Sequence, residues 1–252
     1  MNIPIDLNWL EAVLLAGVRL AAFIVVAPPF SYSAFPGQVK AMVAVALGIA
    51  VSPAVVPGYH QLDTGPFLFA LVMQLLIGFA LGFLVLVVFA VIQSAGNLID
   101  LFGGFQVAQA YDPQLNLNGA QFTKLFQLAA LALLFSSGAY QLILAGLAKT
   151  FTVIPLAAQP NMAVNTHSMI TAVTTMFVSA VQIAGPLIIV LFLADVGLGL
   201  LTKIAPALNA FAMGYPIKIL ITLLLGGVMF VALPNIVAAL TGDAVQAIAG
   251  FR

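Results

Sequence analysis

Residues 66–93 read PFLFALVMQLLIGFALGFLVLVVFAVIQ and carry no charged side chain. A helix needs about 20 mostly apolar residues to cross the hydrocarbon core of a bilayer. This stretch is therefore long enough to span a membrane with a tilt, to bend, or to hold two shorter pieces. Other segments of the chain also reach this length, and they are residues 10–27, 39–56, 124–147, 168–194 and 217–240. The pattern predicts an all-α membrane protein with about six hydrophobic helices or helical hairpins.

The composition of the whole chain supports a single integral membrane domain over residues 1–252. Hydrophobic residues make up 63% of the sequence, charged residues 6%, and the mean hydropathy is +1.21. Soluble domains are about 25% charged, so a soluble fold of this length could not cover its surface. Zero net charge without basic runs argues against nucleic-acid binding. The absence of cysteine excludes disulfides and thiolate metal sites.

Proline and glycine interrupt several of these segments. Pro186 lies inside the fifth segment, where proline removes a backbone hydrogen bond and bends a helix. Pro234 is expected to break the sixth. Gly78 and Gly82 form a GxxxG pattern in the third, which is typical of a close helix–helix approach. The sequence therefore predicts kinked helices and one tight packing surface.

A polar stretch, GNLIDLFGGFQVAQAYDPQLNLNGAQFTK, occupies residues 96–124 between two apolar segments. It holds seven of the 22 Asn and Gln residues of the chain. Irregular backbone at membrane depth must be buried in protein or line an aqueous cavity. The stretch is therefore either a pathway lining or an ordinary loop outside the membrane, and composition leaves both open.

Several residues of this stretch suit a constriction that closes around variable cargo. The two consecutive glycines allow backbone conformations closed to other residues, and the Asp-Pro pair is a turn signal. Aromatic side chains flank both points. The candidate gating residues are Phe102, Gly103, Gly104, Phe105, Tyr111, Asp112 and Pro113.

Three charged residues lie in or beside apolar segments. Arg19 lies in the middle of the first segment, where a charge usually faces a partner or water. It is either a contact with another subunit or a proton-linked group, or it pairs structurally or extends to an interface. Asp195 and Lys203 are eight residues apart, too far for a direct pair along one helix. We expect both to be structural or to face a partner.

No pattern in the chain indicates catalysis. His60 and His167 stand alone, and the sequence has no HExxH, GxSxG or phosphate-binding glycine loop. We therefore expect neither an enzyme nor a cofactor. A secondary transporter with broken helices around a midplane site and a purely structural scaffold remain as alternatives to a pathway component.

Five stretches together resemble one known family. They are VRLAAFIVVAPPFSYSAFPGQVK (18–40), IGFALGF (77–83), AGNLIDLFGGFQVAQAYDP (95–113), KTFTVIPL (149–156) and GLGLLTKIAPALNAFAMGYPIK (197–218). In this order and spacing they resemble the FliR/SctT family of type III secretion export gates, over nearly the whole chain. The flagellar branch of that family fits better than the virulence branch.

The resemblance implies a core subunit of the flagellar protein export gate in the bacterial inner membrane, at the flagellar basal body. It implies a helical, multi-subunit assembly with FliP and FliQ, and with FlhB at the cytoplasmic entrance. The assembly would pass unfolded flagellar subunits, and many apolar helices would stand above the lipid and pack against other subunits. Residues 96–124 would form a plug in the lumen that seals the closed channel.

Overall fold

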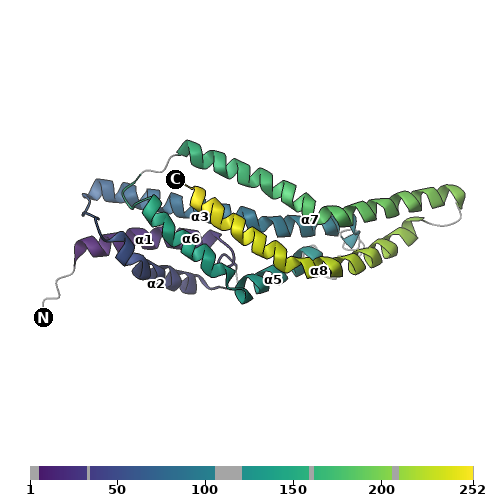
Figure 1. The fold of residues 1–252 in the computed structure, drawn as a ribbon, viewed down its shortest axis with the longest axis horizontal. Coiled ribbons are helices and arrows are strands. Elements are labelled where there is room, and N and C mark those ends of the chain that lie inside the picture. The colour runs from purple at the N-terminus through teal and green to yellow at the C-terminus, as the bar shows by residue number, and fades with distance from the viewer. Residues whose placement is uncertain (1–5, 33–34, 106–120, 159–161, 206–209, 252) are drawn as a thin grey trace. The chain divides into compact units, whose positions relative to one another are not determined.

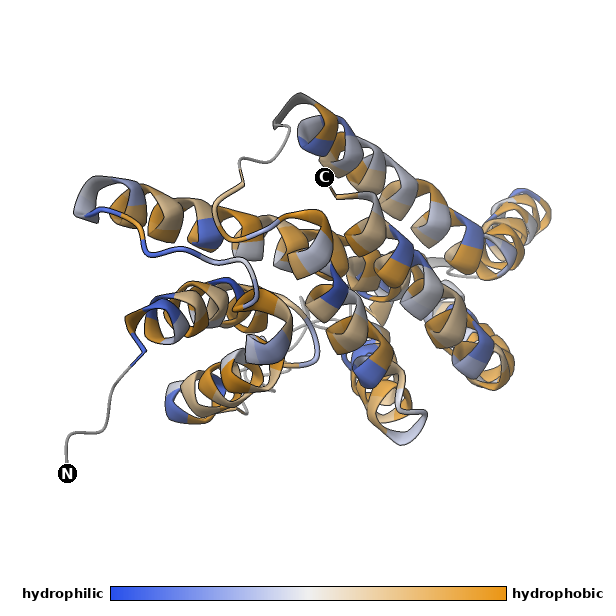
Figure 2. Ribbon diagram, turned by 60° about the vertical axis from the view of Figure 1, so that its left-hand side comes forward, coloured by the Kyte–Doolittle hydropathy of each residue, from blue (hydrophilic) through white to orange (hydrophobic). Residues whose placement is uncertain are grey.

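A computed structural model describes residues 6–32, 35–105, 121–158, 162–205 and 210–251 (Figure 1). The regular elements of these ranges are all helices, and the prediction of an all-α membrane protein is confirmed. Five helices are long and apolar enough to cross a membrane, or six if one bent pair counts as a single span. Apolar residues run along every helix in Figure 2, with hydrophilic residues at scattered positions. The helices are α1 (Leu7–Val26), α2 (Gly37–Val55), α3 (Thr64–Phe102), α5 (Gln121–Ser136), α6 (Ala139–Val153), α7 (Met162–Ile204) and α8 (Ala210–Gly250).

Local sequence signals explain several helix ends. Helix α1 begins where the Asp6 carboxylate accepts hydrogen bonds from the backbone N–H groups of Asn8 and Trp9, which satisfies free donors of the first turn. Helix α3 ends before Gly104, whose φ of +82° lies in the left-handed region that favours glycine. Helix α6 begins after Gly138, which has a φ of +72°.

The described contacts separate the chain into two compact units. The first comprises residues 1–89, 138–173 and 240–252, and the second comprises residues 90–137 and 174–239. In the first unit α1 packs on α2, and α3 approaches α1 through the GxxxG pattern. A Cβ atom on Gly78 would collide with the Arg19 carbonyl oxygen, and one on Gly82 would lie 3.1 Å from the Phe23 carbonyl oxygen. The tight packing surface predicted from these glycines is confirmed.

One expectation about helix continuity is wrong, and another is met only in part. Residues 124–147 were expected to form one span, and a bend at Ser137 and Gly138 divides them between α5 and α6, which form one span only if the bent pair is counted together. The left-handed backbone of Gly138 is the physical reason, since an α-helix does not continue through it. Pro234 was expected to break the last span, but α8 continues through it. The loss of one backbone hydrogen bond there does not outweigh the regular bonds on either side.

Candidate functional site

Asp100 joins the two described ends of the polar stretch 96–124. It lies on α3 and is fully buried. Its Oδ1 accepts a hydrogen bond from the backbone N–H of Phe122 at 3.0 Å, and its Oδ2 accepts from the N–H of Thr123 at 2.8 Å. These two donors are in the first turn of α5, where a helix has N–H groups without internal partners. Asp100 therefore caps α5 from another helix.

The Thr123 side chain adds to the same cluster. Its hydroxyl lies 2.8 Å from Asp100 Oδ2 and 2.9 Å from Asn97 Oδ1. Asn97 and Asp100 are three residues apart on α3, so their side chains share one face. Gly96 lies on that face too, and a Cβ atom there would lie 2.6 Å from the Thr123 Cα atom. The glycine thus allows α3 and α5 to come this close.

The two glycines among the candidate gating residues have different surroundings. A Cβ atom on Gly103 would lie 2.7 Å from Thr222 Oγ1 of α8 and 2.8 Å from the Ile99 carbonyl oxygen. Gly103 is therefore required for close packing. Gly104 has a positive φ, and a Cβ atom there would lie 2.9 Å from the Tyr215 ring. Each glycine has a steric role of its own within the second unit.

Aromatic rings continue this packing from the end of α3 across α5 to α8. The ring centroids of Phe105 and Phe122 are 5.4 Å apart, and those of Phe122 and Phe126 are 5.8 Å apart. Phe126 stacks on Phe230 at 5.0 Å with an interplanar angle of 13°. Such separations are favourable for aromatic pairs. Phe105 thus begins a connected aromatic row, while Phe102 is half-buried at the end of α3.

The other candidate gating residues are not part of this geometry. Tyr111, Asp112 and Pro113 lie outside the described residues. The structure describes the two ends of the stretch, and the roles of these three residues remain predictions.

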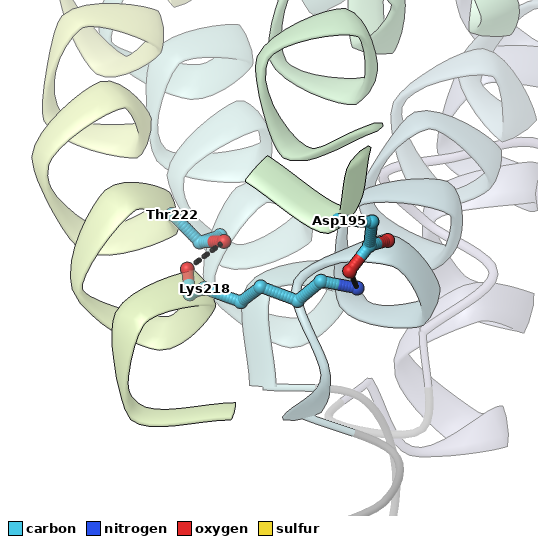
Figure 3. Close-up of polar contacts among 3 residues, drawn as sticks. All are labelled: Asp195, Lys218 and Thr222. Carbon is cyan, nitrogen blue, oxygen red and sulfur yellow. Dashed lines mark hydrogen bonds and ion pairs between the residues drawn. The ribbon is translucent and has the colours of Figure 1, made fainter. Parts of the chain in front are cut away.

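Asp195 of α7 forms an ion pair with Lys218 of α8. Its Oδ1 lies 2.6 Å from Lys218 Nζ on α8 (Figure 3). The Lys218 carbonyl oxygen accepts a hydrogen bond from the Thr222 hydroxyl at 2.7 Å. Lys203 is exposed in the last turn of α7, where a cation is favourable at the negative end of the helix dipole.

Arg19 is fully buried in the first unit and makes three hydrogen bonds, to α3 and to the C-terminal end of α6. Its Nε donates to Gln74 Oε1 of α3 at 2.6 Å, and one terminal nitrogen donates to Thr150 Oγ1 of α6 at 3.3 Å. The other terminal nitrogen donates to the Ile154 carbonyl oxygen at 2.8 Å, just after α6 ends. The guanidinium carbon lies 4.3 Å from the centroid of the Phe151 ring.

Gln74 completes this second cluster. It accepts from Arg19 and donates through Nε2 to the Leu156 carbonyl oxygen at 2.8 Å. Arg19 and Gln74 together therefore bind carbonyl groups at and after the C-terminus of α6. A cation is favourable there because of the helix dipole. This is structural pairing within the chain, one of the readings that the sequence left open.

Sequence reasoning overlooked the partners that make these sites. Gln74 is a single polar residue in an apolar stretch, and no sequence motif marks Thr123 or Thr222. The useful signal was polarity in an apolar context, since a buried polar side chain needs a hydrogen-bond partner. Within the residues that the structure describes, no group of three or more His, Asp or Glu side chains could hold a metal ion.

Comparison with known proteins adds independent information. The family model for bacterial export proteins, family 1, matches residues 10–244. The chain is 29% identical to the flagellar biosynthetic protein FliR of Escherichia coli K12 over 92% of this chain and 87% of that protein. It is 31% identical to FliR of Bacillus subtilis 168 over 94% of this chain and 93% of that protein. It is also 27% identical to the Yop proteins translocation protein T of Yersinia pestis, over 82% and 81% of the two chains.

Proposed function

Since this chain belongs to the bacterial export proteins, family 1, we propose that it is a core subunit of the flagellar type III export gate. The observation that carries the proposal is the family match over residues 10–244, nearly the entire chain. The flagellar relatives cover more of the chain than the translocation protein does. In this role the protein forms part of a membrane channel for unfolded flagellar subunits and performs no chemical step.

The lengths of the helices support a role inside a larger assembly. Helices α3, α7 and α8 contain 39, 43 and 41 residues. At a rise of 1.5 Å per residue each has a contour length of roughly 60 Å, about twice the 30 Å hydrocarbon core of a bilayer. Residues 64–99 of α3 carry no charge at all. Half of the most apolar window of α3 is buried within the chain itself, but only 22% and 17% of the windows of α7 and α8 are, which leaves their surfaces to lipid and partner subunits.

The partners in this proposal are the export-gate proteins FliP and FliQ, with FlhB at the cytoplasmic entrance. The location is the bacterial inner membrane, within the flagellar basal body. Exposed apolar side chains support such partners. Ile204 of α7 is 83% exposed and Val231 of α8 is 80% exposed in the isolated chain. Side chains of this type are normally covered in a membrane assembly by lipid or by another subunit.

Within this assembly, residues 96–124 act as a plug that seals the closed channel. The support is the way in which the ends of the stretch are held, by Asp100 at the start of α5 and by the aromatic row that begins at Phe105. Phe102, Gly103 and Gly104 form the N-terminal end of the plug. Tyr111, Asp112 and Pro113 complete it.

Deletion of the gene in its own host tests the export role. We expect loss of swimming and loss of flagellin from the culture medium, both restored by the wild-type gene on a plasmid. The control is an unrelated secreted protein of the general secretory route, whose level in the medium stays unchanged. Normal flagellin export combined with loss of injected virulence proteins would contradict the flagellar proposal and assign the chain to a virulence system.

Replacement of residues 106–118 by a Gly-Ser linker of equal length tests the plug. The linker keeps the connection between α3 and α5 and leaves Asp100 and Thr123 in place. We expect the gate, purified with its partner subunits and placed in liposomes, to leak ions while its subunit composition is unchanged. A gate as tight as the wild type would refute the plug role without affecting the export role.

A further inference from the structure

A buried carboxylate connects the helices on either side of the proposed plug. We infer that Asp100 is a positioning residue for the seal, because its carboxylate holds the first turn of α5 against the end of α3. The inference rests on the proposed function of the gate and adds a residue that neither the family match nor the motifs assign. It uses only the described residues of α3, α5 and α8.

The charge of Asp100 is compensated by a helix end. Among the described residues, the structure shows an ion pair between Asp195 and Lys218. It shows no ion pair to Asp100 among those residues. Its two oxygens instead accept two backbone N–H groups and the Thr123 hydroxyl, at 2.8 to 3.0 Å. Hydrogen bonds to an ionised acceptor are stronger than those between neutral groups. The positive end of the α5 dipole adds to the attraction.

The surrounding packing makes this contact specific to one position of α5. Residues Gly96, Asp100 and Gly103 recur at spacings of four and three, and so lie on one face of α3. Gly96 admits the Thr123 backbone, and Gly103 admits Thr222 of α8. If α5 shifted by even one turn, Asp100 would lose all of its donors. A buried carboxylate without partners is strongly unfavourable.

The consequence is that the Asp100 contact is a fixed point between the two ends of residues 96–124, beside the ring contact of Phe105 with Phe122. If the seal depends on where those ends are held, a weaker Asp100 contact makes the closed gate leak. Complexes that have already assembled should then leak without losing subunits. A role in folding alone would instead reduce the amount of complex and leave the conductance of each complex unchanged.

The first experiment compares Asp100→Asn and Asp100→Ala with the wild type in the complete gate complex in liposomes. Ion leak is normalised to the amount of assembled complex. We expect both Asp100 variants to leak about tenfold more than the wild type, since losing a hydrogen bond to a charged group changes an equilibrium by about that factor or more. Asp243→Asn is the matched control, because Asp243 is an exposed carboxylate of α8.

The second experiment restores the fixed point without the carboxylate. The chain contains no cysteine, so an introduced pair meets no competing cysteine of this chain. The Asn97 and Thr123 side chains meet between α3 and α5, and Asn97→Cys with Thr123→Cys is the pair introduced in the Asp100→Ala background, with formation of the disulfide checked first. We expect the reduced complex to leak and the oxidised complex to be tight, reversibly and in the same preparation.

The outcomes separate this inference from the proposed function. If the linker variant of residues 106–118 leaks but the Asp100 variants are tight, the plug stands and the inference is wrong. If oxidation does not close the Asp100→Ala leak, position alone does not explain the role of Asp100, and the inference fails. If neither the linker variant nor the Asp100 variants leak, the plug itself is refuted and the inference falls with it.

Discussion

At the scale of single residues, two buried charges are each stabilised by the end of a helix. Arg19 binds carbonyl oxygens at and after the C-terminus of α6, and Asp100 binds N–H groups at the N-terminus of α5. Each charge therefore meets the end of a helix dipole that attracts it. Helices α5 and α6 follow one another with a bend between them. The N-terminal end of α5 and the C-terminal end of α6 are thus each held by a charge of the favourable sign.

The Arg19 cluster should behave as a coupled unit. Arg19→Met leaves the Gln74 side chain and the Ile154 carbonyl without a donor, and Gln74→Leu leaves Arg19 Nε without an acceptor. Each change should destabilise the gate by about 1–3 kcal/mol, the cost of an unsatisfied buried polar group. The double variant should cost less than the sum, by about 0.5–3 kcal/mol.

Thermal unfolding of the purified complex is measured for the wild type, for Arg19→Met, for Gln74→Leu and for the double variant. Arg19→Lys is the control for charge, because a lysine keeps the cation but cannot make the three directed bonds of the guanidinium. It should be nearly as unstable as Arg19→Met. Strictly additive losses would show that Arg19 and Gln74 do not act together.

Tyr59 provides a test in the loop between α2 and α3. Its hydroxyl donates to Glu11 Oε2 at 3.2 Å. Burial, together with the nearby Glu11 charge and this hydrogen bond, raises the pKa of Tyr59 from 10.0 to about 12. Because the raised pKa favours the neutral phenol in the folded state, its contribution to stability is complete below pH 10 and is lost as the pH rises towards 12.

Alkaline titration of tyrosine absorbance in the intact complex follows this group. One of the five tyrosines should ionise later than a free phenol, and that late step should vanish in Tyr59→Phe. Glu11→Gln should move the step to lower pH, because it removes the negative charge. An unchanged titration in Tyr59→Phe would assign the late step to another tyrosine.

The residues of these clusters show where sequence reasoning reaches its limit. The position of Arg19 in an apolar segment correctly indicated a need for partners. The partners themselves were not predictable, because Gln74 is 55 residues away and Thr150 is 131 residues away. No local periodicity connects such positions. The sequence analysis tested Lys203, on the same segment, as a partner of Asp195, but the structure pairs Asp195 with Lys218 of α8.

At the scale of helices, one face of α8 organises the ends of the polar stretch. Thr222, Gly226 and Phe230 recur every four residues, and so lie on one face. Thr222 meets Gly103, Gly226 meets the Phe122 ring, and Phe230 stacks on Phe126. A single helix face thus contacts the end of α3 and the start of α5.

Two adjacent glycines of α8 test this packing. A Cβ atom on Gly226 would collide with the Phe122 ring, which is packed between other phenylalanines, whereas Gly227 has nothing within 4 Å. We expect Gly226→Ala to destabilise the complex by about 1–3 kcal/mol through overpacking. Gly227→Ala should be neutral or stabilising by up to about 1 kcal/mol, because alanine is the better helix former.

Thermal unfolding of the two variants in parallel gives the comparison, with ion leak as the second measurement. The leak should rise in Gly226→Ala alone, since only this change displaces Phe122. Equal behaviour of the two variants would mean that the Phe122 ring moves aside freely.

Helix boundaries were predicted at some glycines and prolines and missed at others. Gly104, in the Gly-Gly pair after α3, has the positive φ that such a pair allows. The Ser137-Gly138 pair carries an equally good turn signal, but the apolar residues on both sides outweighed it in the prediction of one span. At Pro234 the error was the opposite: a break was predicted, but α8 continues, because a long helix tolerates one missing hydrogen bond.

At the scale of the whole molecule, two long apolar helices are left mostly uncovered by the rest of the chain. The most apolar windows of α7 and α8 are only 22% and 17% buried within the chain. Each of these helices has a contour length of about twice the hydrocarbon thickness. Hydropathy predicted which segments are apolar, but it could not say what covers them, since lipid and a partner subunit favour the same side chains.

Photo-crosslinking decides what covers this surface. A photoreactive amino acid at Ile204 or Val231, which are 83% and 80% exposed, should form covalent adducts with other gate subunits in the native membrane. The same amino acid at Leu233, which is 3% exposed, should give crosslinks within the chain and serves as the control. Partner adducts at both exposed positions are expected, because helices of this length extend beyond the lipid. Adducts with lipid alone at both positions would mean that these parts of α7 and α8 lie within the bilayer, and would remove them from the subunit interface.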